Sequence, residues 1–430
     1  MSASLPAPDS PRHDPYAALR VPDFRRFIAA RASFVVATRI QGLVVSWQLF
    51  KLTGDPWKLG LIGLTEAIPS IAVSLYAGHV ADSIKRKNII LVSVALLVLC
   101  AGALAGLSSA AGGRLLAAEH LGTLPIYAVI FVSGIARGFL GPALFSYMPQ
   151  LLPDRDKLAN AITWNSTTWQ GSSVIGPVIG GYLIAPLGVG GAYAVATSLL
   201  LVAWTLFGSL ASHPLPAREG AAPDFRESIG TGLKFIFGNQ LVLAALSLDL
   251  FAVLFGGAVA MLPVFAESIL KVGSTGLGHL ESAPALGSVL MAVLLTYFPL
   301  RRHAGRKLLW AVAGFGLATI GFALSRNFWL SMGLLFLTGM FDSVSVIVRS
   351  TLLHTFTPEH MKGRVSAVNN IFIGSSNEIG AFESGAVAKW LGTATSVVFG
   401  GIMTLIVVGI TALSADKLRR LDMTPEKPNA

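Results

Sequence analysis

Charge is scarce in this sequence. Only 13% of its 430 residues are charged, whereas 53% are hydrophobic. Soluble domains carry roughly twice that share of charge, so the common soluble folds are excluded. Apolar stretches of about 20 residues, the length that crosses a bilayer as a helix, recur along almost the whole chain. The composition therefore predicts a membrane protein that crosses the bilayer many times.

Cysteine is almost absent, and the familiar motifs of enzymes are missing. The one cysteine, Cys100, excludes a disulfide within the chain, and no Cys or His cluster has the spacing of a metal site. No Walker A pattern is present, so the sequence does not predict an ATP-driven pump. We therefore expect neither an enzyme nor a bound metal or cofactor.

Turn residues and charges divide the apolar sequence into twelve predicted helices. Their approximate limits are 28–50, 58–80, 88–110, 123–150, 159–185, 191–211, 239–266, 276–299, 306–325, 328–352, 365–389 and 394–415. The longest polar break separates them six and six. The predicted parts are a tail (1–26), a first six-helix bundle (27–211), a central loop (212–238), a second six-helix bundle (239–415) and a second tail (416–430). The predicted fold is all-α, with two bundles related by pseudosymmetry.

Basic residues lie mainly in alternate loops of this topology. With the N-terminus in the cytoplasm, 22 of the 32 Lys and Arg residues fall on the cytoplasmic side, 6 on the other side and 4 inside apolar segments. This asymmetry follows the positive-inside rule and predicts that both termini are cytoplasmic. It also explains the net charge of +10 without a nucleic-acid partner, because the bases form no single stripe.

The two halves of the chain resemble each other in sequence. The matched stretches are 63–69 with 278–284, 131–134 with 336–339, and 153–157 with 358–362. Two six-helix repeats around a site at the membrane midplane are typical of secondary transporters. The repeat therefore predicts a transporter with its site between the bundles.

The loop after the second predicted helix reads GHVADSIKRK, from Gly78 to Lys87. It resembles the signature loop of the major facilitator superfamily, and the resemblance extends over essentially the full length of the chain. Glycine, acid and the two closing bases match at Gly78, Asp82, Arg86 and Lys87, whereas Ser83 and Lys85 depart from the pattern. The resemblance implies a cytoplasmic gate, in which the acid pairs with a neighbouring helix end in the outward-open state.

Two further motifs resemble those of the superfamily. Arg137 with Gly141 resembles the fourth-helix arginine motif, which implies proton coupling. The fifth predicted helix resembles the Gly-Pro motif of proton-driven exporters, although Ser172 replaces its first glycine. The matching residues are Gly176, Pro177, Gly180 and Gly181. Small residues also serve plain helix packing in membranes, so both interpretations of this motif stay open.

Three stretches of the second half, 341–349, 363–370 and 375–380, resemble the branch that contains the enterobactin exporter and related efflux proteins. That resemblance implies export of a siderophore or an amphipathic drug-like molecule across a bacterial inner membrane. We expect a monomer. Substrate does not follow from the branch, because one fold supports many functions.

Ionisable side chains inside membrane spans are functional candidates because they are costly to bury. The candidates for proton coupling or a central cavity are Arg39, Glu66, Arg137, Asp249, Asp342 and Glu378. Arg137 and Asp342 occupy equivalent positions in the two halves. They either flank the cavity together or are each neutralised within their own bundle, Asp342 by Arg349.

Glu66 and Arg137 offer two alternatives. A carboxyl group in a dry cavity can carry a proton, and a rearrangement of the pair would release it. The same carboxylate could instead be a permanent ion-pair partner that joins the second and fourth helices. Asp249 and Glu378 are rival proton carriers, and Glu281 repeats the Glu-x-x-Pro pattern of Glu66 nearer the outer face.

The sequence favours a proton-coupled secondary exporter that works by alternating access. Its partners are then a small-molecule substrate, protons and the bilayer. Two alternatives remain: an importer or uniporter on the same fold, and a membrane sensor or assembly protein that does not transport. The many charges at midplane depth disfavour the last alternative.

Overall fold

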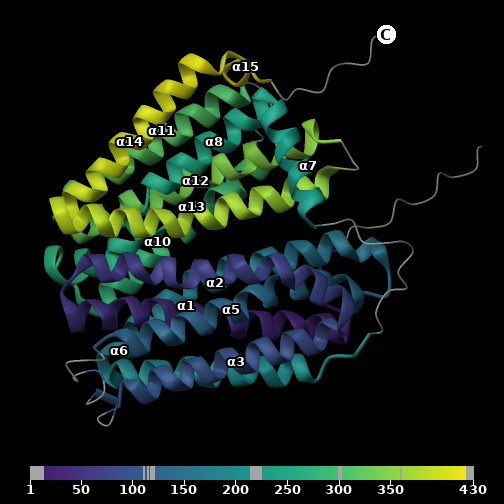
Figure 1. The fold of residues 1–430 in the computed structure, drawn as a ribbon, viewed down its shortest axis with the longest axis vertical. Helices are drawn as coiled ribbons and strands as arrows, with labels where there is room; N and C mark the ends of the chain where they lie inside the picture. The colour runs from purple at the N-terminus through teal and green to yellow at the C-terminus, as the bar shows by residue number, and fades with distance from the viewer. Residues whose placement is uncertain are drawn as a thin grey trace, which may run out of the picture.

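The computed structural model describes residues 14–109, 112–113, 116, 122–213, 225–298, 303–358 and 361–422. Within these residues every regular element is helical. Figure 1 shows two groups of helices, one above the other, with α2, α10 and α13 at their junction. The prediction of an all-α fold is confirmed.

The lower group in Figure 1 contains the first half of the chain. Its elements are α1 (Pro22–Thr53), α2 (Pro56–Ser83), α3 (Arg86–Leu107), α5 (Leu124–Tyr147), η1 (Met148–Leu151), η2 (Arg155–Lys157) and α6 (Leu158–Gly208). Gly54 ends α1 in the left-handed conformation, with φ of 62°, and the side chain of Asp55 caps the start of α2. α6 bends at Gly188, where φ is 67°, so its 51 residues form two spans.

The upper group contains the second half. Its elements are α7 (Phe225–Gly238), α8 (Gln240–Phe255), η3 (Ala258–Met261), α9 (Leu262–Val264), η4 (Phe265–Ile269), α10 (Gly273–Tyr297), α11 (Ala304–Leu324), α12 (Phe328–Phe356), α13 (Lys362–Leu391), α14 (Thr393–Ser414) and α15 (Asp416–Arg419). The linker helix α7 packs on the upper group, where Gly232 lies against Arg364 and Val368 of α13.

The seventh predicted helix, 239–266, is not continuous. α8 ends at Phe255, and a short 3-10 turn, a single α-turn and a π-helix continue the path to Ile269. Gly257 lies in this break and allows α13 to approach closely, because a Cβ there would lie 2.6 Å from the carbonyl oxygen of Gly380. Non-helical backbone at membrane depth is tolerated where it is buried in protein. The prediction of one regular helix was wrong here because the apolar run conceals the break.

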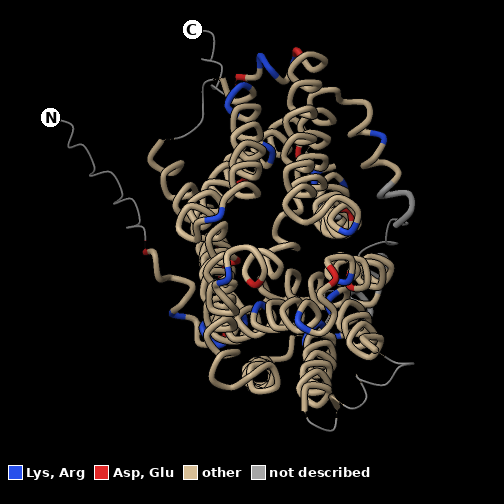
Figure 2. Tube along the Cα trace, turned by 90° about the vertical axis from the view of Figure 1, so that its left-hand side faces the viewer, with Lys and Arg blue, Asp and Glu red and all other residues tan. Residues whose placement is uncertain are grey.

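Nine helical segments of the described chain are long and apolar enough to cross a membrane. One of them is the bent α6, which supplies two spans, and the membrane-length helices α2 and α13 fall outside that set. About twelve spans result, and the twelve-helix prediction is confirmed. Figure 2 shows that most of the trace carries no charge, as a bilayer-spanning fold requires.

The sequence repeat reappears as a repeated helix crossing. Gly134 of α5 lies against the carbonyl of Glu66 and the ring of Pro69 in α2. In the second half, Gly339 of α12 lies against the backbone of Pro284 in α10. Glycine permits both close approaches because neither crossing leaves space for a Cβ. Each crossing fixes the depth of the charged residue three positions later, which is Arg137 in the first half and Asp342 in the second.

The molecule has two ends that differ in their connections. The linker end is the end at which α1 begins, α6 finishes and α7 lies, at the right in Figure 1. The far end is the opposite one, where α1 meets α2 and α13 meets α14.

Candidate functional site

Glu66 and Arg137 form an ion pair between α2 and α5. The Nη1 atom of Arg137 donates to Oε1 of Glu66, and both side chains are partly buried. The crossing at Gly134 brings the two helices together one turn away. The structure thus places these two predicted residues in direct contact, and its geometry is compatible with both a proton carrier and a permanent ion pair.

Glu378 approaches this pair from the other bundle. A Cβ placed on Gly63 of α2 would lie 2.6 Å from Oε2 of Glu378, so the carboxylate of α13 rests on the backbone of α2. Glu378 also interacts electrostatically with both Glu66 and Arg137. Charges from both halves therefore meet at the junction.

Arg39 of α1 joins the same group. Its guanidinium interacts electrostatically with Glu66, Arg137 and Glu281, the last of which belongs to α10 in the other bundle. We call these five residues the junction cluster: Arg39, Glu66, Arg137, Glu281 and Glu378. It contains two cations and three carboxylates, so the fully ionised cluster carries one net negative charge.

Asp249, Asp342 and Arg349 form a second, separate group inside the C-terminal half. Arg349 pairs with Asp249, and the hydroxyl of Ser345 donates to Oδ1 of Asp249 at 3.1 Å. Asp249 and Arg349 are 6% and 4% exposed. Asp342 lines a cavity of about 10 Å³ with Asp249 and Ser345, which is room for about one water molecule.

The alternative in which Arg349 neutralises Asp342 is therefore not found, because Arg349 pairs with Asp249. Arg349 lies two turns along α12 from Asp342, but its side chain is held by Asp249 of α8. The alternative that Arg137 and Asp342 flank one cavity stays a prediction: Asp342 lines the small cavity beside Asp249, whereas Arg137 contacts Glu66.

The helix-five motif contacts two different partners. Gly176 and Gly180 face α1, where they make room for Arg39 and Ile40. Pro177 and Gly181 face α10, where their backbone lies against Gly278. The motif therefore packs α1 on one side and the opposite bundle on the other, and Gly176 positions the Arg39 side chain.

The two closing bases of the signature loop anchor helix ends. Arg86 Nη1 donates to the carbonyl of Ser146 at 3.3 Å, at the end of α5. Lys87 Nζ donates to the carbonyls of Gly208 and Leu210 at 2.7 and 2.6 Å, at the end of α6. Gly78 and Asp82 lie outside the residues whose side chains the structure describes, so the gate function of this loop stays a prediction.

Side-chain contacts join the bundles at the far end. Lys51 Nζ, at the end of α1, lies 2.6 Å from Oε1 of Glu267 in the π-helix η4. The rings of Trp57 and Phe382 have centroids 5.0 Å apart, and the ammonium group of Lys389 lies 5.6 Å from the Trp57 centroid. Sequence reasoning counted Lys51 as a loop charge, and nothing local in the sequence identified Glu267 as its partner.

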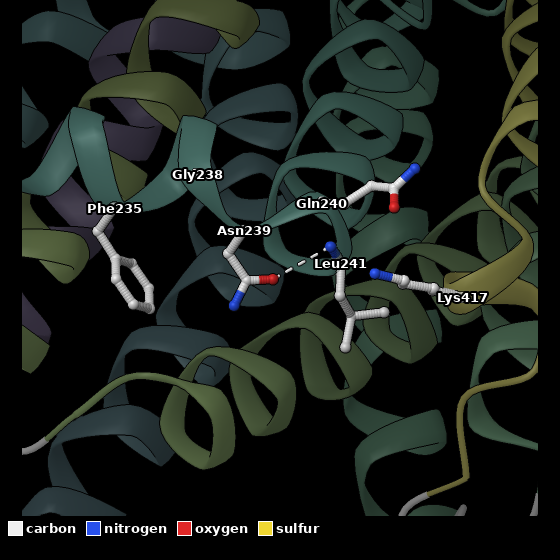
Figure 3. Close-up of a pocket in the computed structure, with 6 residues that line it drawn as sticks. All are labelled: Phe235, Gly238, Asn239, Gln240, Leu241 and Lys417. Carbon is white, nitrogen blue, oxygen red and sulfur yellow. Dashed lines mark hydrogen bonds between the residues drawn. The ribbon is translucent and has the colours of Figure 1, made fainter.

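A pocket of about 490 Å³ lies at the linker end of the C-terminal half, between α7, α8 and α15. Figure 3 shows its lining, with Asn239 bonded to the backbone of Leu241 and with Lys417 beside Leu241 and Gln240. The Asn239 side chain is thus already used as the cap of α8. None of the residues that line this pocket belongs to a helix that carries the junction cluster.

Across the described residues, no group of three or more His, Cys, Asp or Glu side chains could hold a metal ion.

The chain matches known proteins along most of its length. Residues 28–381 match the model of the Major Facilitator Superfamily. Enterobactin exporter EntS of Shigella boydii is 27% identical over 419 residues, which is 95% of each chain. EntS of Escherichia coli O1:K1 has the same identity and coverage.

Solved structures of transporters share the fold. A crystal structure of the nucleoside transporter NupG superposes with a TM-score of 0.71 at 13% identity, covering 91% of this chain and 99% of that one. A POT family transporter solved with 5-aminolevulinic acid gives a TM-score of 0.70 at 10% identity, covering 92% and 96%. The helices, the repeated crossing and these matches agree: the chain belongs to the Major Facilitator Superfamily and is a secondary transporter of the membrane, not an enzyme.

Proposed function

We propose that this transporter is a proton-coupled exporter of an amphipathic small molecule, of the siderophore or drug-like class, in a bacterial inner membrane. The superfamily membership and the full-length similarity to proteins named as enterobactin exporters support the substrate class. The asymmetry of basic residues supports a cytoplasmic linker end, with both termini on that side.

The junction cluster is the observation that carries proton coupling. Its two arginines balance two of its three carboxylates, so one added proton makes the cluster neutral. Glu378 and Glu281 belong to one bundle, whereas Arg39, Glu66 and Arg137 belong to the other. Separation of the bundles changes the charge balance around Glu66, and a proton bound there compensates for the change.

The contacts between bundles support a conformation open toward the linker end. The Lys51–Glu267 pair, the Trp57–Phe382 contact and the approach of Gly181 to Gly278 all lie in the far half. In an alternating-access cycle these contacts open while the linker end closes. Substrate therefore enters from the cytoplasm or inner leaflet in the conformation described.

Proton coupling is tested with the purified full-length protein. A thermal-shift screen over siderophores and amphipathic drugs first identifies a ligand, because binding to the folded state raises the melting temperature. The protein is then reconstituted into vesicles that contain a pH-sensitive dye. We expect the ligand to drive proton movement across the vesicle membrane, and Glu66→Gln to abolish it.

The matched control is Asp154→Asn, which removes an exposed carboxylate outside the membrane spans. It should leave proton movement unchanged. Ligand transport without proton movement in the wild type would overturn proton coupling, and full coupling in Glu66→Gln would remove Glu66 as the carrier. Uptake only into inside-out vesicles is the expected direction for an exporter, and uptake only into right-side-out vesicles would contradict export.

A further inference from the structure

Two arginines of α1 face one tryptophan of α6. The guanidinium carbon of Arg31 lies 5.0 Å from the ring centroid of Trp169, and that of Arg39 lies 5.5 Å from the same centroid. At about 1.5 Å per residue, Arg31 is about 13 Å and Trp169 about 16 Å from the linker ends of their helices. Arg31 and Trp169 therefore lie inside the membrane span, nearer the linker end than Arg39, which belongs to the junction cluster.

Arg31 has no negative partner in the described part of the chain. No carboxylate there lies within ion-pair distance, and its Nε atom is buried without a hydrogen bond. Arg39 differs, because it interacts with Glu66 and Glu281. A cation–π contact is weak beside the cost of an unpaired charge in a bilayer. Arg31 is half-buried and Arg39 is exposed, yet both cations lie against one ring at membrane depth, where two like charges are unfavourable unless an anion joins them.

The position of Arg39 places the group beside the space between the bundles. Its electrostatic partners lie on α2, α5 and α10, so its guanidinium faces elements of both halves. Trp169 is 40% exposed, which leaves part of the ring free to contact a ligand. Arginine is well suited to such a site because its planar donors match a carboxylate.

We propose that Arg31, Trp169 and Arg39 form a subsite for the anionic group of the substrate, which makes the substrate class an amphipathic organic anion. This inference rests on the proposed function, because it assumes that the substrate passes through the space between the bundles. An anion between the two guanidiniums neutralises Arg31 and competes with Glu66 and Glu281 for Arg39. Substrate binding therefore alters the charge balance of the junction cluster.

The test compares three probes that share one fluorophore: dansylglycine, an anion; its methyl ester, which is neutral; and dansylcadaverine, a cation. Binding to the full-length protein in phosphatidylcholine nanodiscs is measured by equilibrium dialysis, without a proton gradient. We expect the wild type to bind the anion at least tenfold more tightly than the ester, and to bind the cation most weakly.

Arg31→Gln and Arg39→Gln should each reduce the preference for anion over ester about tenfold, whereas Arg31→Lys should keep part of it because the charge remains. Arg25→Gln is the matched control, since Arg25 is an exposed arginine near the start of the same helix. The ratio of anion to ester binding is measured within each variant, so partial misfolding affects both probes alike.

Equal binding of anion and ester by the wild type would overturn the proposal, and so would an unchanged preference in both Gln variants. An anionic lipid headgroup could also occupy the subsite, and nanodiscs that contain phosphatidylglycerol test this. If that lipid weakens dansylglycine binding to the wild type but not to Arg31→Gln, the site belongs to a lipid headgroup and the substrate assignment is wrong. Because the binding assay needs no proton movement, failure of proton coupling leaves its result intact.

Discussion

The ammonium group of Lys51 lies 2.6 Å from the Oε1 atom of Glu267, and this ion pair joins the two halves of the transporter at the far end. Lys51 is the last basic residue of α1, whereas Glu267 lies in the π-helix that ends the broken seventh span. Both side chains are partly exposed, so the pair adds modestly to the stability of the closed far end.

Lys51→Gln should shift the population toward conformations in which the far end is open. Exposed ion pairs contribute about 0.2–1 kcal/mol, so the ratio of the two populations should change by up to about fivefold. Spin labels at Leu52→Cys and Leu391→Cys in a Cys100→Ser background measure the separation of the bundles. Charge exchange in the double variant Lys51→Glu with Glu267→Lys should restore the wild-type distribution, and an unaltered distribution in Lys51→Gln would refute the role of the pair.

Asp249→Ala should strongly destabilise the C-terminal half. It leaves Arg349 buried without its partner, and removal of one member of a buried ion pair costs about 3–5 kcal/mol. The measurement is thermal unfolding of the purified protein. Asp416→Ala, which breaks the exposed pair with Arg419, is the control and should cost less than about 1 kcal/mol. The double variant Asp249→Leu with Arg349→Met should recover most of the loss, because no unpaired charge remains.

Gly339→Ala should lower the stability by about 1–3 kcal/mol, because the added methyl group meets the backbone of Pro284 and forces α10 and α12 apart. Gly333→Ala is the matched control on the same helix, since a Cβ there has no atom within 4 Å. It should be neutral or slightly stabilising, as expected when a helical glycine becomes alanine. Equal melting temperatures for the two variants would contradict the close crossing.

Lys87→Gln should destabilise the N-terminal half by about 1 kcal/mol, because it removes a charged donor from two carbonyls at the end of α6. The neighbouring Lys85 is exposed and serves as the control. Its change to Gln should stay within about 0.5 kcal/mol. A larger effect at Lys85 than at Lys87 would show that the loop depends on charge alone and not on these bonds.

The number of spans was predictable because a bilayer demands apolar segments of a minimum length. The backbone conformation at two places, the bend in α6 and the break after α8, was not predictable. The sequence predicted a loop around Pro186, but a single left-handed residue, Gly188, turns the chain and the helix continues on either side. The break after Phe255 has no polar residue to mark it, and the close approach of Gly380 from α13 beside it depends on the tertiary packing.

The members of the charged site were predictable, but their partners were less so. Glu66 and Arg137 were predicted from their depth in the membrane spans. Their contact was predicted because the second and fourth helices belong to the same six-helix repeat. Asp249 and Arg349 are 100 positions apart in sequence, and only the rotation of α8 and α12 decides that they meet. Arg31 is one of the four basic residues that lie inside apolar segments of the sequence, whereas its contact with the ring of Trp169 depends on the packing of α1 on α6.

The repeated glycine crossing bears on how the two halves diverged after duplication. Gly134 and Gly339 hold the same place in each copy because backbone meets backbone there, and no other residue is small enough. Three positions later the copies carry opposite charges, Arg137 in one and Asp342 in the other. The scaffold was inherited twice under one steric constraint, while the polar positions beside it were free to specialise. A symmetric ancestor could thus give rise to a transporter with different charges in its two halves, without any change in how its helices cross.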